Sequence, residues 1–271
     1  MKFSNILSKK NKVLLKELII TDFKLRYQGS ALGYLWSLLK PLMLFAVMYV
    51  VFVHFLRFGE GVNHFAVQLL LGTILWSFFI EATVQGMQAV VNRGDLIRKI
   101  NFPKYIIVIS ATVSALINLL LNLVIVVIFM LVDGVDFGWT VLLFPATIAL
   151  LYAFALSLAF WLSALYVKFR DISHLWEVFL QALFYATPIF YPVQMVMEFN
   201  TQAAQGLMMN PVAVLIQSAR AQLVGYDSVV TAGQIIFNPI FLALPYIFIG
   251  VVAMGATWYF KKSQAKFAEN I

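Results

Sequence analysis

The stretch that decides the fold is residues 104–132, KYIIVISATVSALINLLLNLVIVVIFMLV. Its only charged residue is Lys104, at the first position, and the rest is a continuous apolar run with a few small polar residues. A helix needs about 20 mostly apolar residues to cross the hydrocarbon core of a bilayer. Because the apolar residues are continuous and do not alternate with polar ones, the stretch predicts a membrane-spanning helix and not a strand of an outer-membrane barrel.

The composition of the whole chain agrees with this stretch. The chain has 271 residues, of which 62% are hydrophobic and 11% are charged, and its mean hydropathy is +0.90. A soluble domain carries about a quarter charged residues, so the composition excludes a water-soluble enzyme and a disordered chain. The sequence contains no cysteine, which excludes disulfides, thiolate metal sites and thiol nucleophiles.

Similar apolar runs recur along the chain, and they predict an all-α integral membrane fold in a single domain 1–271. Six spans are expected, at residues 32–56, 65–91, 104–132, 140–167, 173–193 and 234–260, and Pro188 and Pro192 are expected to interrupt the fifth. Residues 12–28 mix apolar and charged residues at helical spacing, which predicts an N-terminal amphipathic helix lying in the membrane interface. Residues 193–222 are too polar for a free span, and we expect them to form two short re-entrant helices that dip in from outside. A helix lying on the outer leaflet is the alternative.

Lysine and arginine are distributed unevenly between the two sides that six spans define. Seventeen of the 19 lie on the side that carries both chain ends, and only Arg57 and Arg220 lie on the other side. Cytoplasmic loops carry an excess of these residues. We therefore expect a multi-pass protein of the cell inner (plasma) membrane with both termini in the cytoplasm. The net charge of +7 is then a topology signal, so no nucleic-acid partner is expected beside the lipid bilayer.

The loop after the second span contains a short amphipathic segment at residues 95–100. Leu96, Ile97 and Ile100 fall on one helical face, with Arg98 on the other and Asp95 at the start. A short helix of this kind can dock in a groove of a soluble partner. It can equally rest on lipid headgroups, and composition alone does not separate the two interpretations.

Motifs for enzyme chemistry are missing from the sequence. It contains no Walker-type glycine loop, no H-E-x-x-H and no G-x-S-x-G, so no catalytic, cofactor-binding or metal site is expected in this chain. His174 and Glu177 are spaced for a metal or proton site, but a polar helix start at the interface is the favoured interpretation.

Glu81 lies near the middle of the second expected span, followed by Thr83, Gln85 and Gln88 mostly on one side. Ionisable residues inside a membrane are costly, so this polar stripe marks either a passage or a hydrogen-bond network between helices.

Several local patterns occur in order along the chain: RYQGSALGYLW at 26–36 with Pro41, NFP at 101–103, FRDI at 169–172, FYATPIFYP at 184–192, Asn210-Pro211 and Arg220. Together they resemble the permease subunit of ABC-type polysaccharide exporters, the family that exports O-antigen, capsular polysaccharide and wall teichoic acid. The resemblance extends in order from about residue 12 to residue 262.

The resemblance implies that two copies of the chain pair as a homodimer with two separate ATP-binding subunits, which hold the ATP and Mg. The interfacial helix and residues 95–100 (Asp95, Leu96, Ile97, Arg98, Ile100) would then contact the ATPase. The substrate would be a lipid-linked polysaccharide on a polyprenyl pyrophosphate carrier. The outside gate would lie in residues 193–222 and the segment before it, with Pro188, Tyr191, Pro192, Asn210, Pro211 and Arg220.

Aromatic residues of the first and fifth spans would line the conduit. The expected lining residues include the aromatic Tyr49, Trp76, Phe184 and Tyr185, because aromatic faces suit sugar rings. Glu81 is expected there as part of the polar stripe. By charge, we expect Lys24, Arg26 and Lys40 to contact the pyrophosphate. The alternatives are an ABC exporter of small lipids or drugs, a membrane lipid-sugar transferase, and a passive channel.

Overall fold

The computed structural model describes residues 9–27, 33 and 35–267, without the side chains of residues 23, 25–27 and 266. Within this part of the chain every regular element is a helix. The longer elements are α1 (Lys9–Tyr27), α2 (Leu35–Met48) with its π-helical continuation η2 (Tyr49–Phe55), α3 (Phe65–Asn92), α5 (Tyr105–Val132), α6 (Phe144–Lys168) after the 3-10 turn η3 (Trp139–Leu143), α7 (Ile172–Tyr185), α10 (Pro211–Val224) and α12 (Pro239–Ser263). The short elements are α4 (Gly94–Lys99), α8 (Val193–Phe199), α9 (Thr201–Leu207), α11 (Ala232–Ile235) and η4 (Gln264–Lys266).

Five helical segments in the described residues are long and apolar enough to cross a membrane, namely α2 with η2, α3, α5, η3 with α6, and α12. The predicted all-α membrane class is therefore confirmed. The fifth expected span, over residues 173–193, is not among the five because α7 has 14 residues and ends at Tyr185. Pro188 accounts for this end, since proline has no N–H and disfavours helical backbone at Thr187. The end lies just before Pro188, the first of the two prolines that were expected to interrupt this span.

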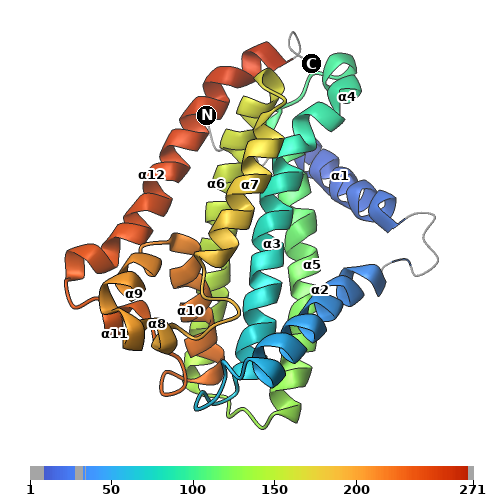
Figure 1. The fold of residues 1–271 in the computed structure, drawn as a ribbon. Coiled ribbons are helices and arrows are strands. Elements are labelled where there is room, and N and C mark those ends of the chain that lie inside the picture. The colour runs from blue at the N-terminus through green and yellow to red at the C-terminus, as the bar shows by residue number, and fades with distance from the viewer. Residues whose placement is uncertain (1–8, 28–32, 34, 268–271) are drawn as a thin grey trace.

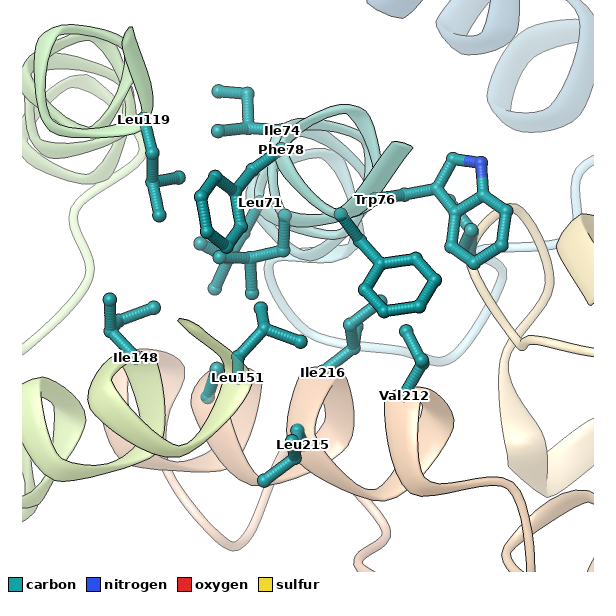
Figure 2. Packing of buried hydrophobic residues seen from close by; sticks show 14 of the residues in the cluster. Leu71, Ile74, Trp76, Phe78, Leu119, Ile148, Leu151, Val212, Leu215 and Ile216 are labelled. Carbon is teal, nitrogen blue, oxygen red and sulfur yellow. The ribbon is translucent and has the colours of Figure 1, made fainter. Parts of the chain in front are cut away.

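Helix α3 is the centre of the bundle (Figure 1), and it packs most extensively against α5 and α6. Helix α10 lies across α3 and α6, and α12 packs on α6. Figure 2 shows the shared core, in which Leu71 and Phe78 of α3 face Leu119 of α5, Leu151 of α6 and Ile216 of α10. Leu71 and Ile216 are fully buried.

Small residues allow α3 and α6 to approach each other closely. A Cβ atom added to Gly86 of α3 would collide with the methyl group of Ala159 in α6. Packing of this kind matters in a membrane because lipid tails are as apolar as leucine, so helices associate through close contact and polar bonds. Gly86 therefore sets the spacing of the two helices.

Helices α1 and α4 and the last turns of α12 lie at one end of the bundle (Figure 1). Helix α1 packs on α5 and buries Leu18. Asp22 of α1 pairs with Arg93, the residue before α4, so the two helices are joined by an ion pair. This end carries most of the lysine and arginine residues, and we call it the basic end.

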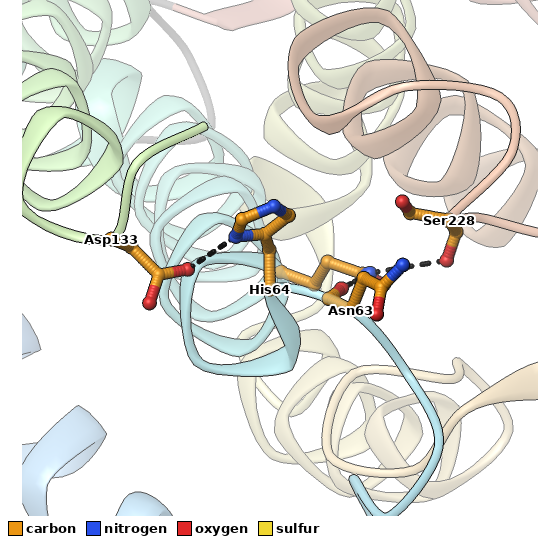
Figure 3. A network of polar contacts seen from close by, with 5 residues as sticks. Asn63, His64, Asp133 and Ser228 are labelled. Carbon is orange, nitrogen blue, oxygen red and sulfur yellow. Dashed lines mark hydrogen bonds and ion pairs between the residues drawn. The ribbon is translucent and has the colours of Figure 1, made fainter. Parts of the chain in front are cut away.

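The opposite end holds α8, α9 and α11 and the loops before α3 and after α5 (Figure 1). Residues 193–222 contain α8, α9 and most of α10, where two short helices were expected. Figure 3 shows how the loops are tied: His64 Nδ1 lies 2.7 Å from a carboxylate oxygen of Asp133. Gln68 Nε2 donates to the carbonyl oxygens of Asn63 at 2.9 Å and Ser228 at 3.3 Å.

Helix α2 is strongly inclined to the rest of the bundle (Figure 1). Its first turn is level with the middle of α5, because Asn122 Nδ2 donates to the carbonyl oxygen of Ser37 at 3.1 Å. Towards its C-terminal end, α2 contacts the end of the bundle opposite the basic end, where Phe45 packs edge-on against Phe129 of α5. Helix α2 therefore covers mainly the half of the bundle away from the basic end.

Candidate functional site: a polar stripe and two cavities beside helix α3

Helix α3 is buried along most of its length, but one narrow stripe in its second half is partly exposed. The stripe has helical spacing and consists of Ser77, Ile80, Glu81, Val84, Gln85 and Gln88. Four of these six residues are polar, at a depth where the surrounding helices are apolar. Polar side chains at membrane depth face water, a ligand or another protein surface, because lipid cannot satisfy them. Thr83, which was expected on this stripe, is fully buried and accepts a hydrogen bond from Trp176 Nε1 at 3.2 Å.

One side of the stripe borders a cavity of about 670 Å³ between α2, α3 and α5, which we call the α2 cavity. Its polar lining residues are Ser37, Lys40, Ser77, Glu81, Gln85, Asn118 and Asn122, with Trp36 and Phe78 as aromatic walls. Asn118 Nδ2 donates to Glu81 Oε1 at 2.7 Å, and Gln85 Nε2 donates to the same oxygen at 3.3 Å. The side-chain oxygen of Asn122 is buried, and no described residue donates to it.

The other side of the stripe borders a second cavity of about 680 Å³ between α3 and α7, which we call the α7 cavity. Ile80 and Val84 line both cavities, so the two spaces adjoin along α3. The polar residues of the α7 cavity are Gln88, Ser173, His174, Glu177 and Gln181. His174 and Glu177 thus face a cavity, yet the described residues contain no group of three side chains suited to hold a metal ion.

Aromatic side chains meet where the α7 cavity approaches the end of the bundle opposite the basic end. Phe190 lies at the centre, with its ring centroid 4.6 Å from Phe52, 5.5 Å from Phe184 and 6.0 Å from Tyr185. Trp76 joins through Phe184 at 5.8 Å. The cluster therefore contains three of the expected conduit residues, Trp76, Phe184 and Tyr185. The first expected span contributes Phe52 to it, where Tyr49 was expected.

Tyr49 and Glu81, the other two expected conduit residues, lie outside this cluster. Tyr49 contacts Phe45 within its own helical segment, at 5.8 Å between ring centroids. Glu81 faces the α2 cavity.

Residues 186–192 are not helical, and we call this segment the break after α7. Arg220 of α10 holds it in place. Its side chain is 1% exposed, and it donates to the carbonyl oxygens of Gln68 at 2.8 Å, Pro188 at 2.6 Å and Ile189 at 2.7 Å. A fourth bond, at 2.9 Å, reaches Gln217 Oε1. The guanidinium thus connects α3, α10 and the segment 186–192, and it supplies donors to carbonyl oxygens that a helix would otherwise pair.

The other residues expected at the gate surround the same break. Asn210 accepts from the N–H of Val212 at 3.0 Å as the N-cap of α10, and its Nδ2 donates to Thr187 Oγ1 at 2.9 Å. Pro211 occupies the first turn of α10, where no backbone donor is needed. Tyr191 donates to the carbonyl oxygen of Tyr185 at 2.9 Å. Pro192 immediately precedes α8.

The expected coupling residues lie at the tip of the basic end (Figure 1), where residues 95–98 belong to α4 and Ile100 follows the helix in extended backbone. Asp95, Arg98 and Ile100 are exposed, and Ile100 has 51% of its surface accessible. Ile97 is 4% exposed and packs in a core cluster of its own chain, with half-buried Leu96 beside it. The apolar face of α4 is therefore largely used within the chain, and Ile100, just past the helix, is the accessible apolar residue.

The residues expected to contact the carrier head-group lie in different surroundings. Lys24 is exposed on α1, at the side of the basic end. Lys40 lines the α2 cavity together with Glu81, level with the middle of α3 and not at the basic end. The side chain of Arg26 lies outside the described residues.

Sequence reasoning missed Asn118 and Asn122, which together with Glu81 form the polar floor of the α2 cavity. The signal was present, because two asparagines spaced four apart interrupt an otherwise apolar span and share one helical face. Gln68, whose carbonyl oxygen accepts from Arg220, was missed because only the fold brings it there, whereas Gln217 lies one helical turn before Arg220 in α10.

Comparison with known proteins shows sequence similarity along most of this chain. Residues 13–224 match the model of the ABC-2 type transporter family. The chain is 29% identical over 262 residues to the O-antigen export system permease protein RfbA of Myxococcus xanthus, which covers 95% of both chains. It is also 28% identical over 203 residues to an O-antigen export system permease protein RfbA of Klebsiella pneumoniae, covering 73% of this chain and 75% of that one. The family match extends over most of the chain, and the chain therefore belongs to the ABC-2 type transporter family.

Proposed function

We propose that this chain is the membrane subunit of an ATP-driven exporter that moves a lipid-linked polysaccharide out of the cytoplasm. The observation that carries the proposal is the similarity to the Myxococcus xanthus O-antigen export permease over 95% of both chains. The polar stripe of α3 supports it, because a passage through a membrane needs polar groups at mid-depth.

The exporter contains two copies of the chain and two ATP-binding subunits in the inner (plasma) membrane. The basic end faces the cytoplasm, since positively charged loops are retained there. This orientation needs an even number of crossings, and α7 with residues 186–193 completes the sixth. ATP and Mg are bound by the partner, and this chain performs no catalytic step.

Movement of the ATPase reaches the membrane through α4 and α1. Exposed Asp95 and Arg98 of α4, and Ile100 just after it, contact the ATPase, while Ile97 anchors the helix in the chain's own core. The ion pair between Asp22 and Arg93 connects α1 to α4, so a displacement of either helix by the ATPase is transmitted to the other.

The conduit follows the stripe of α3 past the α7 cavity to the aromatic cluster around Phe190. Flat rings suit this part because the C–H face of a sugar packs on a π surface. The gate is the break after α7, which Arg220 and Asn210 hold through hydrogen bonds. By their charge, Lys24 and Arg26 are proposed to meet the pyrophosphate of the carrier lipid before the sugar chain enters.

Purification of the tagged chain from its native membrane in a mild detergent tests the proposal. We expect an ATPase subunit to co-purify in about a one-to-one ratio, and lipid-linked glycan to stimulate its activity. A chain that elutes alone in several detergents contradicts the proposal.

The contact through α4 is tested with the double variant Arg98→Glu/Ile100→Asp, which changes exposed side chains only. We expect it to insert in the membrane and to lose the ATPase. The matched control is Phe199→Asp at the other end, where the side chain is 92% exposed. A double variant that retains the ATPase as well as this control does refutes the docking assignment.

A further inference from the structure

The two cavities beside α3 have a charge character that differs from the basic end. Among the described residues that line them, Lys40 is the only lysine or arginine, and it shares the α2 cavity with Glu81. The α7 cavity contains the carboxylate of Glu177 and no lysine or arginine in its described lining. Counting Lys40 as +1 and the two glutamates as −1 each, the described lining carries a formal charge of −1.

We infer that the path along α3 selects an uncharged, hydroxyl-rich sugar chain and discriminates against a polyanionic polymer, such as one built of uronic acids or polyol phosphates. This inference rests on the proposed function and specifies the substrate class within it.

Electrostatics disfavours a polyanion beside such a lining. Each acidic repeat would pass Glu177 at membrane depth with no lysine or arginine in the described lining of that cavity, and at this depth charges are poorly screened and like charges repel strongly. Pores that conduct anions or phosphates use rings of arginine or lysine. Lys40 cannot provide such a ring, because it is a single cation whose charge is balanced by Glu81 in the same cavity.

The lining suits hydroxyl groups. The carboxylates of Glu81 and Glu177 and the amide oxygens accept hydrogen bonds, and the amide N–H groups of Gln85, Gln88 and Gln181 donate them. The side-chain oxygen of Asn122 has no described donor, which a hydroxyl group can supply.

Aromatic rings stand beside these polar groups in both cavities. Trp36 and Phe78 line the α2 cavity, and Trp76, Phe184 and Tyr185 line the α7 cavity. Carboxylates, amides and flat rings together satisfy the edge and the face of an uncharged sugar.

The natural absence of cysteine allows the charge of the path to be measured without transport. In the assembled complex, single variants Ser77→Cys and Gln88→Cys report on the α2 and α7 cavities. We compare their reaction rates with a trimethylammonium and with a sulfonate methanethiosulfonate reagent, each relative to a free thiol. The cationic reagent should react about tenfold faster at Gln88→Cys, in the cavity of Glu177, and the preference should be smaller at Ser77→Cys, where Lys40 balances the charge of Glu81.

At Gln88→Cys, adding Glu177→Gln should reduce this preference to about twofold, while Glu198→Gln, on the exposed surface of α8, should leave it unchanged. Equal rates for the two reagents at Gln88→Cys, a faster sulfonate reagent there, or no reaction at that position would overturn the inference.

Transport tests the same inference with substrates. The probes are two polyprenyl-pyrophosphate-linked oligosaccharides of equal length, one of neutral hexoses and one of the matching uronic acids. The wild-type complex in liposomes should move the neutral chain at least about tenfold faster. The double variant Glu81→Lys/Glu177→Lys should narrow that ratio, and Glu198→Lys should not.

The outcomes separate the inference from the proposed function. Equal transport of both chains overturns the inference and leaves the exporter assignment intact. If the wild-type complex moves neither chain, the proposed function fails, and the inferred substrate class fails with it.

Discussion

Helices α2 and α3 have similar hydropathy but very different surroundings. The mean hydropathy of their most apolar windows is 2.0 and 1.7, yet 11% of the α2 window and 78% of the α3 window is buried within the chain. In water the more apolar helix would be the buried one. In a bilayer, lipid satisfies an apolar surface as well as protein does, so close packing and polar bonds decide which helix becomes central.

Helix α3 has both of these features. Gly72 and Gly86 allow Arg220 and α6 to approach it closely, and Glu81 bonds to Asn118 of α5. Helix α2 is connected to α5 by Asn122 and to α3 by a weak contact of Thr73 with the sulfur of Met48. The following predictions test whether this difference in packing is also a difference in stability.

The largest effect is expected for Arg220→Met. Three backbone oxygens lose a donor at about 1–3 kcal/mol each, partly offset by removal of a desolvated charge, so we expect a loss of about 3 kcal/mol. The thermal midpoint of the purified protein should fall by about 6–12 °C. Arg57→Met is the control, because the side chain of Arg57 is exposed and its ion pair among the described residues is with exposed Glu60. Equal midpoints for the two variants would show that Arg220 does not fix α10 to α3.

An intermediate effect is expected for Gly86→Ala, which places a methyl group against Ala159. Forcing α3 and α6 apart should cost about 1–3 kcal/mol, measured as a lower thermal midpoint. Gly250→Ala in α12 has open space and should be nearly neutral. The double variant Gly86→Ala/Ala159→Gly should recover most of the loss, and failure to recover would refute the close approach as its cause.

The smallest effect is expected for a valine-to-alanine substitution, which is made once in α3 and once in α2 so that the two helices are compared directly. Val67 of α3 is 1% exposed and Val47 of α2 is 63% exposed. Val67→Ala should lower stability by about 1 kcal/mol because it leaves a cavity. Val47→Ala should change it by less than about 0.5 kcal/mol. If Val47→Ala lowers the midpoint as much as Val67→Ala does, α2 is packed against protein in the purified state.

Much of the fold could be predicted from local sequence. Residues 65–91 and 104–132 were expected as spans, and α3 and α5 occupy 65–92 and 105–132. These boundaries were accessible because charged residues and prolines end apolar runs. The span at 173–193 was expected to be interrupted by Pro188 and Pro192, and α7 ends at Tyr185, just before the first of these prolines.

The candidate site was only partly predictable. Glu81 and Phe184 were identified because a carboxylate inside a span and an aromatic pair near a proline are local signals. Glu81 lies in the α2 cavity and Phe184 lies in the aromatic cluster, and this separation depends on which helices flank α3. Tyr49 was expected beside them and packs elsewhere.

The sequence by itself determined that this protein is a helical membrane protein with a basic end. Those properties depend on the length of apolar runs and the position of charges along the chain, which are local quantities. Only the tertiary structure decided that Arg220 holds the carbonyl oxygens of Pro188 and Ile189, and that Asn118 meets Glu81. Such pairings join segments far apart in sequence, and in a bilayer they follow from close packing of particular helices, which hydropathy does not encode.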